Sequence, residues 1–420
     1  MTGQAYEAAL LRLLAVPSSP RLGLERMEAL LAGLGDPQRA FRSLHVAGTN
    51  GKGSVCAFLD ATLGAAGVRR GLTTSPHLTS ATERIRIDGA SVSRERFLEL
   101  EAEVASAAGR LDDAPTFFER MIAMAFLAFR EAGVEVAVVE VGLGGRLDAT
   151  NVLVPIAAGI SRVGLDHQQF LGDTLADIAR EKAGILKRGV PARSAPQEPA
   201  AEDAIRTRAL EVGAELSFVS DDDVRALEGA HLGLQGPHQR ENAALALSLL
   251  DAAGLAPDAR ARAEGLARAR WPGRFEAVAD APLVVLDGAH NPLGARTLAR
   301  ALVSDERTRG RPLSLVVGMT RGHEGAPFAR ELAGTLDVRR VFAVRARAPR
   351  SRPADEVASD LSAGGLAAVE RSAVDGAVDE ARALAAGEGG VVVVTGSLYL
   401  VGEVRARFVE MEVDPVLPEF

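Results

Sequence analysis

Short apolar runs alternate along the chain with longer stretches whose apolar residues recur every three or four positions. The run at 134–141 is almost wholly apolar, as expected of a buried parallel strand. Strands that alternate with helices in this way predict an α/β protein built on parallel sheets. We predict strands at 43–47, 134–141, 156–160, 283–286, 313–317, 341–344 and 391–395, and helices at 53–66, 94–108, 117–131, 175–187, 239–253, 292–302 and 375–386.

The length of 420 residues indicates more than one domain. Pro272, Pro282 and a short acidic stretch precede a new series of strands and helices, so we place a domain boundary near 279–282. We predict a larger N-terminal domain, 1–278, and a smaller α/β domain, 283–420.

Composition excludes several classes of protein. The net charge is −8 and only 4% of the residues are aromatic, so we expect no nucleic-acid partner. The longest apolar stretch, 121–129, is too short to span a bilayer, and the first residues lack the basic-then-apolar order of a secretory signal. The single cysteine, Cys56, excludes a disulfide framework and a cysteine-based metal site. We therefore expect a cytoplasmic protein with no membrane partner.

The segment 45–54, HVAGTNGKGS, joins a predicted strand to a predicted helix through a glycine-rich turn. Such a turn binds phosphate oxygens through backbone N–H groups, while a lysine adds charge and a serine hydroxyl can ligate Mg²⁺. The Walker A pattern is matched imperfectly, because Val46 replaces a glycine and Gly53 separates Lys52 from Ser54. The alternative is an ordinary glycine-rich turn. Only three of the 48 Lys and Arg residues are lysines, so the lysine in this turn favours nucleotide binding.

Three other features remain open from their pattern alone. Glu140 ends an apolar strand, where a carboxylate either ligates Mg²⁺ or marks the exit of the strand from the core. His167 alone is typical of a loop histidine, and the seven histidines include no HxH or HxxxH pair, so we expect no zinc site. The loop 142–151, GLGGRLDATN, has Leu147 where G-x-G-x-x-G requires glycine, which excludes a dinucleotide site.

These segments resemble the folylpolyglutamate synthase/dihydrofolate synthase family of the Mur ligase superfamily. GTNGKGS at 48–54 resembles the phosphate loop of those ATP-dependent amide ligases. Seven further segments follow in the order of that family: TSPHL (74–78), EVGLGGRLDATN (140–151), LDH (165–167), REKAGI (180–185), HQREN (238–242), PGRF (272–275) and DGAHNP (287–292). One segment departs, because GMTRGHE at 318–324 stands where the family has an acidic, lysine-containing segment.

The resemblance implies a fold and a reaction. The fold is a P-loop-containing N-terminal ATPase domain with a parallel sheet, followed by a smaller Rossmann-like α/β domain that binds glutamate. The reaction is the ATP-dependent addition of L-glutamate to dihydropteroate, to a reduced folate, or to both, through an acyl phosphate. The family suggests a monomer.

The resemblance also implies roles for single residues. For ATP it implies Thr49, Asn50, Gly51, Lys52, Gly53, Ser54, Asn242, Arg274, Asp287 and His290. For two Mg²⁺ ions it implies Ser54, Ser75 and Glu140 on one ion, with Glu140 shared, and His167 on the second. For the pterin it implies Arg21, Leu22, Thr116, Phe117, Phe118, Glu119, Leu147, Asp148 and Ala149. Phe117 and Phe118 could offer flat faces to an aromatic ring, although core packing is the alternative for one of them.

Lys182 lies on the predicted helix that follows His167. A solvated helix lysine is the alternative, but this chain uses arginine almost everywhere that a cation is needed. Lysine can lose its proton and add CO₂ to form a carbamate, and the matching lysine of the family is carbamylated. We expect a catalytic Lys182 carbamate at the second Mg²⁺, beside the catalytic Lys52, Glu140 and His167. Lys187, five residues on in the same predicted helix, faces elsewhere and is expected to be dispensable.

Two other functions remain as alternatives. A Mur-type peptidoglycan amino-acid ligase carries a further N-terminal domain, whereas only 47 residues precede Gly48. A nucleotide-binding protein that is not a ligase would hydrolyse ATP at a rate indifferent to glutamate.

Overall fold

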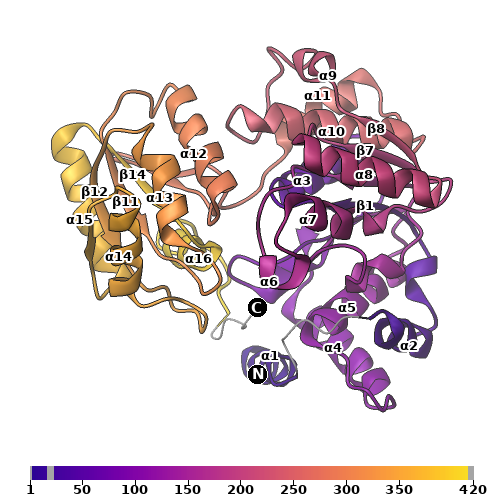
Figure 1. The fold of residues 1–420 in the computed structure, drawn as a ribbon. Helices are drawn as coiled ribbons and strands as arrows, with labels where there is room; N and C mark the ends of the chain where they lie inside the picture. Colours follow the sequence, from indigo (N-terminus) through magenta and orange to yellow (C-terminus); the bar gives the residue numbers. More distant parts are fainter. Residues whose placement is uncertain (1, 17–22, 415–420) are drawn as a thin grey trace.

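The computed structural model describes residues 2–16 and 23–414. These residues form two lobes, and in each lobe helices pack on both faces of one sheet (Figure 1). The predicted α/β class is confirmed. In the described part of the chain, no helix combines the length and the apolar character needed to cross a membrane.

The first lobe is built on a mainly parallel sheet. Its strands lie in the order β4-β3-β2-β5-β1-β6-β7-β8, and the run from β2 to β8 is parallel while β3 and β4 pair antiparallel at one edge. The strands are β1 (Arg42–Ala47), β2 (Arg70–Thr73), β3 (Arg86–Ile87), β4 (Ala90–Ser91), β5 (Val136–Glu140), β6 (Ala157–Ile160), β7 (Pro191–Ser194) and β8 (Glu215–Phe218). The helices are α1 (Thr2–Leu14), α2 (Glu25–Gly33), α3 (Lys52–Ala65), α4 (Arg94–Ala108), α5 (Phe117–Glu131), α6 (Gln168–Leu171), α7 (Leu175–Lys182), α8 (Pro199–Val212), α9 (Asp221–Arg225), α10 (His238–Ala252) and α11 (Ala259–Arg268).

Successive residues of β5 serve opposite faces of this sheet. Val136 and Val138 pack with residues of α3, α10 and α11, whereas Ala137 and Val139 pack with residues of α4 and α5. Every residue of β5 is buried, because helices cover the strand on both sides. This double burial explains why the sequence shows a continuous apolar run rather than an alternating one.

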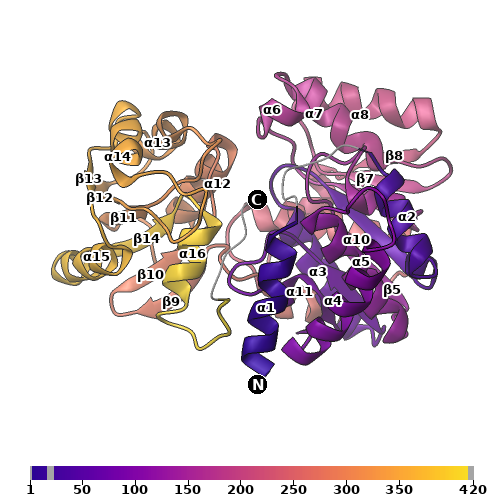
Figure 2. The ribbon, with the colours of Figure 1, turned by 90° about the horizontal axis from the view of Figure 1, so that it is seen from below.

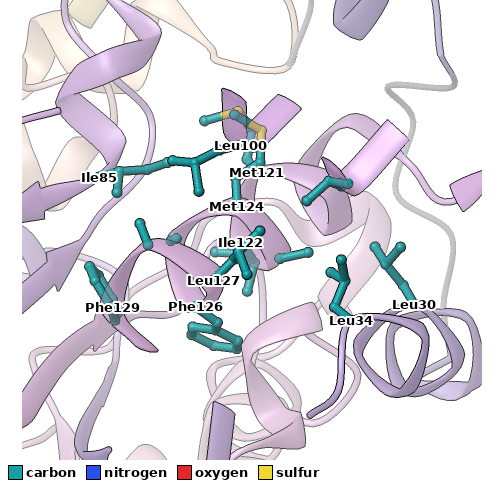
Figure 3. Close-up of a cluster of buried hydrophobic side chains, with 14 of the residues drawn as sticks. Leu30, Leu34, Ile85, Leu100, Met121, Ile122, Met124, Phe126, Leu127 and Phe129 are labelled. Atoms are coloured by element: carbon teal, nitrogen blue, oxygen red, sulfur yellow. The ribbon is translucent and has the colours of Figure 1, made fainter. Parts of the chain in front are cut away.

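Helix α5 forms the centre of the core on one face of the first sheet. Its residues 121–129 are all buried, and Figure 3 shows Met121, Phe126 and Phe129 of this helix among side chains from other elements. The longest apolar stretch of the chain is thus a core helix.

The second lobe is smaller and repeats the layered arrangement. Its sheet has the order β13-β12-β11-β14-β10-β9, with only β9 antiparallel among the described strands. Residues of α12, α13 and α14 share one core with this sheet, and residues of α15 and α16 share the other. The strands are β9 (Glu276–Asp280), β10 (Leu283–Leu286), β11 (Leu313–Val317), β12 (Val338–Ala343), β13 (Ala368–Glu370) and β14 (Val391–Thr395). The helices are α12 (Pro292–Ser304), α13 (Gly325–Ala333), α14 (Ala354–Ala363), α15 (Val374–Glu388) and α16 (Leu398–Arg405).

Two sequence-based boundaries need correction. Strand β9 pairs with β10, so the second sheet begins at Glu276 and the expected boundary at 279–282 cuts through a hairpin. The helix expected at 175–187 ends at Lys182, because a 3₁₀ turn, Ala183–Ile185, follows it. Lys187 therefore lies outside the helix, and the reason for expecting it to be dispensable fails.

Helix α16 and the chain that follows it both contact the first lobe. Helix α16 faces the first lobe (Figure 2), and its Gly402 lies so close to the Leu78 carbonyl oxygen that a Cβ would overlap it. After α16 the chain returns to the first lobe, where the Asp414 carboxylate accepts hydrogen bonds from the Tyr6 hydroxyl at 3.0 Å and the Ala81 N–H at 2.7 Å. The second lobe is therefore held against the first from both of its ends.

We predict that Phe126→Ala lowers the free energy of unfolding of the first lobe by about 3–5 kcal/mol, because it leaves a cavity in the core around α5. Urea unfolding followed by circular dichroism measures the change. The control is Leu210→Ala in α8, where the side chain is 84% exposed and a change within about 0.5 kcal/mol is expected. Equal effects of the two substitutions would contradict this assignment of the core.

Candidate active site

A cavity of about 700 Å³ lies between the carboxyl ends of the strands of both sheets. The first lobe contributes the loops after β5 and β6 and the start of α5, and the second contributes the segments after β10, β11, β12 and β14. Loops at the carboxyl ends of parallel strands are where α/β folds bind ligands. In this chain two such edges meet at one cavity.

The phosphate loop connects β1 to α3 at the same edge. Gly48 has φ of +145°, and the Ser161 hydroxyl occupies the space that a Cβ would need. The Lys52 Nζ donates to the carbonyl oxygens of Gly48 at 3.1 Å and Thr49 at 3.2 Å. The Thr49 hydroxyl accepts a hydrogen bond from the Gly164 N–H at 3.0 Å, which ties the loop to the segment after β6. Gly51 precedes α3 with φ of +93°.

The extra glycine of this loop has a steric reason. A Cβ on Gly53 would lie 2.5 Å from the indole nitrogen of Trp271, the only tryptophan of the chain. The departure from the general Walker A pattern therefore allows the segment that leads to the second lobe to pack against the start of α3.

Two side chains near the start of α10 lie against the phosphate loop. The Gln239 amide lies 3.4 Å from the Ser54 hydroxyl, and its oxygen accepts a hydrogen bond from the Asn242 amide at 3.0 Å. Asn242 is buried and its side-chain oxygen faces Gly51. The structure thus brings Asn242 to the loop, with its amide already bonded on one side.

Glu140 and Ser75 meet at the ends of neighbouring strands. The Glu140 carboxylate is 5% exposed and accepts a hydrogen bond from the Ser75 N–H at 3.1 Å. Burial raises the pKa of Glu140, and the positive charge of Lys52 opposes this shift. Among the described residues, no three His, Cys, Asp or Glu side chains are grouped to hold a metal ion. A cation beside Glu140 would therefore rely on hydroxyl oxygens and water as well, which suits Mg²⁺ better than zinc.

Asp166 is the charged centre of the contact between the lobes. Its carboxylate lies 3.8 Å from His290 Nε2 and 3.9 Å from His323 Nδ1, and it accepts a hydrogen bond from the Asn291 amide at 2.9 Å. Burial acts to raise the pKa of Asp166, but the hydrogen bond and charge of His290 hold it well below its usual value. His167 directly precedes α6, with φ of +50°, and its ring centre is 6.0 Å from that of His323.

Asn291 also reaches the phosphate loop. The Asn50 amide donates to the Asn291 side-chain oxygen at 3.1 Å, and the Asn291 amide is 3.3 Å from the Asn50 oxygen. One side chain of the second lobe therefore joins the phosphate loop to Asp166.

Arg274 and Asp287 lie together where the chain enters the second lobe. The Asp287 carboxylate accepts hydrogen bonds from the N–H groups of Phe275 and Ala289, each at 2.9 Å. Burial lowers the pKa of Arg274, whereas the negative charge of Asp287 opposes that shift. Asp287 thus holds this loop beside the arginine.

Lys182 is the last residue of α7 and is only 5% exposed. Burial, followed by the positive charge of Lys52, lowers the pKa of Lys182 to about 7. Lys187 has a different environment, because its Nζ donates to the Asn151 carbonyl oxygen at 3.1 Å. Lys182 is buried and Lys187 is half-buried, so the two lysines differ in environment, although not for the helical reason.

Of the residues predicted to bind a pterin, some line the cavity and others are occupied in contacts within the protein. Thr116 caps α5 in a reciprocal pair with Glu119, whose carboxylate also binds Arg26 at 3.1 Å. Phe118 lines the cavity, whereas Phe117 packs in the core, with the Arg84 guanidinium 5.4 Å from its ring centre. Only Phe118 of the two aromatic residues can therefore face a ligand.

The loop after β5 contributes Leu147 and Ala149 to the cavity wall. Asp148 also lies there, but its carboxylate accepts hydrogen bonds from the N–H groups of Gly142 at 3.0 Å and Leu143 at 2.9 Å. Asp148 therefore shapes the loop from within. The two other residues predicted to bind the pterin, Arg21 and Leu22, lie outside the described residues.

Sequence reasoning missed several cavity residues. Leu165 and Phe170 are 49% and 45% exposed, respectively, although they are apolar, and both line the cavity. Exposed apolar side chains cannot be distinguished from core residues by pattern alone. The cavity is also lined by Arg84, Arg350 and Tyr399. None of these three belongs to a motif that the sequence analysis singled out.

Comparisons with known proteins agree with this geometry. The Mur ligase, glutamate ligase domain family matches residues 273–398. Dihydrofolate synthase/folylpolyglutamate synthase of Bacillus subtilis is 34% identical over an alignment that covers 92% of this chain and 94% of the relative.

Two solved structures show the same fold. E. coli FolC in complex with DHPP and ADP is 33% identical, with a TM-score of 0.84 over 96% of this chain and 97% of that chain. A bifunctional folylpolyglutamate synthase/dihydrofolate synthase with Mn, AMPPNP and L-glutamate bound is 32% identical, with a TM-score of 0.84 over 97% and 99%. The chain therefore belongs to the dihydrofolate synthase/folylpolyglutamate synthase family of ATP-dependent ligases.

Proposed function

We propose that this chain activates a pterin-linked carboxylate with ATP and joins it to the amine of L-glutamate. The observation that carries the proposal is the cavity between the carboxyl ends of both sheets, whose lining residue Asn291 is bonded to the phosphate loop. This arrangement can hold a nucleotide, an acceptor and an amino acid beside one another.

The phosphate loop supplies the nucleotide site. Residues 51–54 present backbone N–H groups at the start of α3, whereas the N–H groups of Thr49 and Asn50 donate to the Arg162 carbonyl oxygen. Lys52 turns from its two loop carbonyls to the phosphates. Arg274 adds a second positive charge. Asn242, Asp287 and His290 complete the site toward the base and ribose.

Two Mg²⁺ ions fit the polar groups around the phosphate loop. Ser54 in the first turn of α3, Ser75 after β2 and Glu140 at the end of β5 offer oxygen atoms to the first ion. His167, with a carbamate on Lys182, serves the second ion. Magnesium neutralises phosphate charge during transfer. The low pKa of Lys182 supports the carbamate, because only a neutral amine adds CO₂, with loss of one proton.

The reaction proceeds in two balanced steps. An oxygen of the acceptor carboxylate attacks the γ-phosphorus, and ADP leaves. The glutamate nitrogen then attacks the carbonyl carbon of the acyl phosphate, phosphate leaves and the nitrogen loses a proton. Lys52 and Arg274 offset the charge of the two anions that must approach each other.

The pterin lies on the first-lobe wall. Phe118, Leu147 and Ala149 offer an apolar surface for its ring, and Leu165 and Phe170 extend that surface toward solvent. Every group in this scheme comes from one chain, which supports a monomer. The single cysteine is buried and free, which supports the cytoplasm as the compartment.

We predict that ATP, dihydropteroate and hydroxylamine yield a hydroxamate in the absence of glutamate, because the acyl phosphate is then trapped. L-Glutamate should replace hydroxylamine as the nucleophile that attacks the acyl phosphate, and it should stimulate phosphate release. Phosphate release that is indifferent to glutamate would indicate a nucleotide-binding protein that is not a ligase. Activity confined to a UDP-sugar peptide would indicate a Mur-type ligase.

We predict that Lys182→Ala lowers kcat about 100-fold or more, with partial rescue by small carboxylates, because a metal-orienting oxygen is lost. In ¹³C-bicarbonate buffer, the wild type should show a carbamate resonance that Lys182→Arg lacks. The control is Lys187→Arg, which keeps both the charge and the donor to Asn151 and should retain the resonance and the activity. A fully active Lys182→Arg enzyme would rule the carbamate out.

A further inference from the structure

Two arginines from separate segments of the second lobe stand together on the wall of the cavity. The segments that follow β11 and β12 pair at Thr320 and Ser351. The Arg321 N–H donates to the Arg350 carbonyl oxygen at 2.9 Å, and the Arg350 guanidinium donates to the Arg321 carbonyl oxygen at 3.0 Å. These contacts fix the two residues side by side, and both line the cavity.

Neither arginine is used in an ion pair within the described residues. Nearby arginines are paired, since Arg347 lies 3.3 Å from Glu403 and Arg352 lies 2.7 Å from Asp360. Glu324, an exposed residue of the same segment, lies within 4.0 Å of neither arginine among the described contacts. Arg321 therefore keeps its guanidinium donors available for an anion, and Arg350 keeps those that do not bond the Arg321 carbonyl oxygen.

A third arginine, Arg84, lines the same cavity and is buried. Arg84, Arg350 and Tyr399 all line the cavity. Burial raises the pKa of Tyr399, and the positive charges of Arg84 and Arg350 oppose this shift. Arg84 is buried and donates a hydrogen bond to His77 Nδ1 at 2.9 Å, whereas Arg321 is exposed. The basic side chains thus run from the interior of the cavity to solvent.

A single amino acid held at the reaction centre needs no contact with an exposed arginine. A ligand that reaches from the apolar first-lobe wall to solvent, with carboxylates along its length, would use the whole series. A γ-linked oligoglutamate has this character, because each of its residues keeps a free α-carboxylate.

We propose that Arg321 and Arg350 bind the α-carboxylates of a γ-glutamyl tail on the acceptor, and so set the preference of this enzyme for tail length. The inference rests on the proposed function, since it assumes that the acceptor is a folate. It also accounts for the departure at 318–324, where this chain carries Arg321 instead of the acidic, lysine-containing segment.

The test is direct binding, measured by calorimetry with a non-hydrolysable ATP analogue present. The ligands are dihydropteroate, a monoglutamyl tetrahydrofolate and a triglutamyl tetrahydrofolate. Arg321→Gln is the main variant, because the hydrogen bonds that Arg321 makes within the wall use only its backbone. Arg350→Gln is the second variant. The matched control is Arg345→Gln, since Arg345 is exposed in the same segment and does not line the cavity.

We expect Arg321→Gln to weaken binding of the triglutamyl ligand about tenfold and that of dihydropteroate less than about twofold. Arg345→Gln should change neither. An equal loss for all three ligands, or no loss for the triglutamyl ligand, would overturn the proposal. Failure of the wild type to incorporate glutamate would instead contradict the proposed function, because tail binding is measured without turnover.

Discussion

The site depends on one contact, in which Asn291 of the second lobe binds both Asp166 and Asn50 of the first. Asn291 also caps α12 through the Gly294 N–H at 2.8 Å, so its side chain is fixed by the helix that it begins. Because parallel strands present their ligand-binding loops at one edge, two such sheets can share a substrate only if those edges face each other. The Asn291 contact meets this requirement.

Burial gives the site its electrostatic character. Glu140, Lys182 and Arg274 all have pKa values shifted toward their neutral forms, and burial is the main cause at each. A poorly hydrated site strengthens the attraction between the protein and a bound phosphate. The same environment lets a lysine lose its proton near neutral pH, which a solvated lysine does not do.

The sequence predicted the fold class and the position of the glycine-rich loop between β1 and α3, because both depend on local signals. The apolar run of β5 and the glycines around Lys52 can be recognised in the sequence without knowledge of tertiary contacts. Strands β7 and β8 were missed because Pro191 and alternating exposed residues weaken their apolar pattern. The boundary near residue 279 was misplaced because β9 is half-exposed and resembles a linker.

The candidate site was only partly predictable, for reasons of geometry. Phe117 and Phe118 are adjacent in sequence, yet helical geometry directs one into the core and the other to the cavity. Asp148 matched the motif, but its carboxylate is satisfied by its own loop. The Asp166 contacts with His290 and His323 join distant segments, and no spacing rule could reveal them.

The central claim is that the acceptor carboxylate is phosphorylated before glutamate attacks it. The most direct test follows the transfer of oxygen from the acceptor carboxylate to phosphate, with an acceptor that carries ¹⁸O in its reacting carboxylate. The account predicts that one labelled oxygen appears in inorganic phosphate for each amide bond formed, as measured by mass spectrometry. Amide formation that leaves the phosphate unlabelled would contradict it.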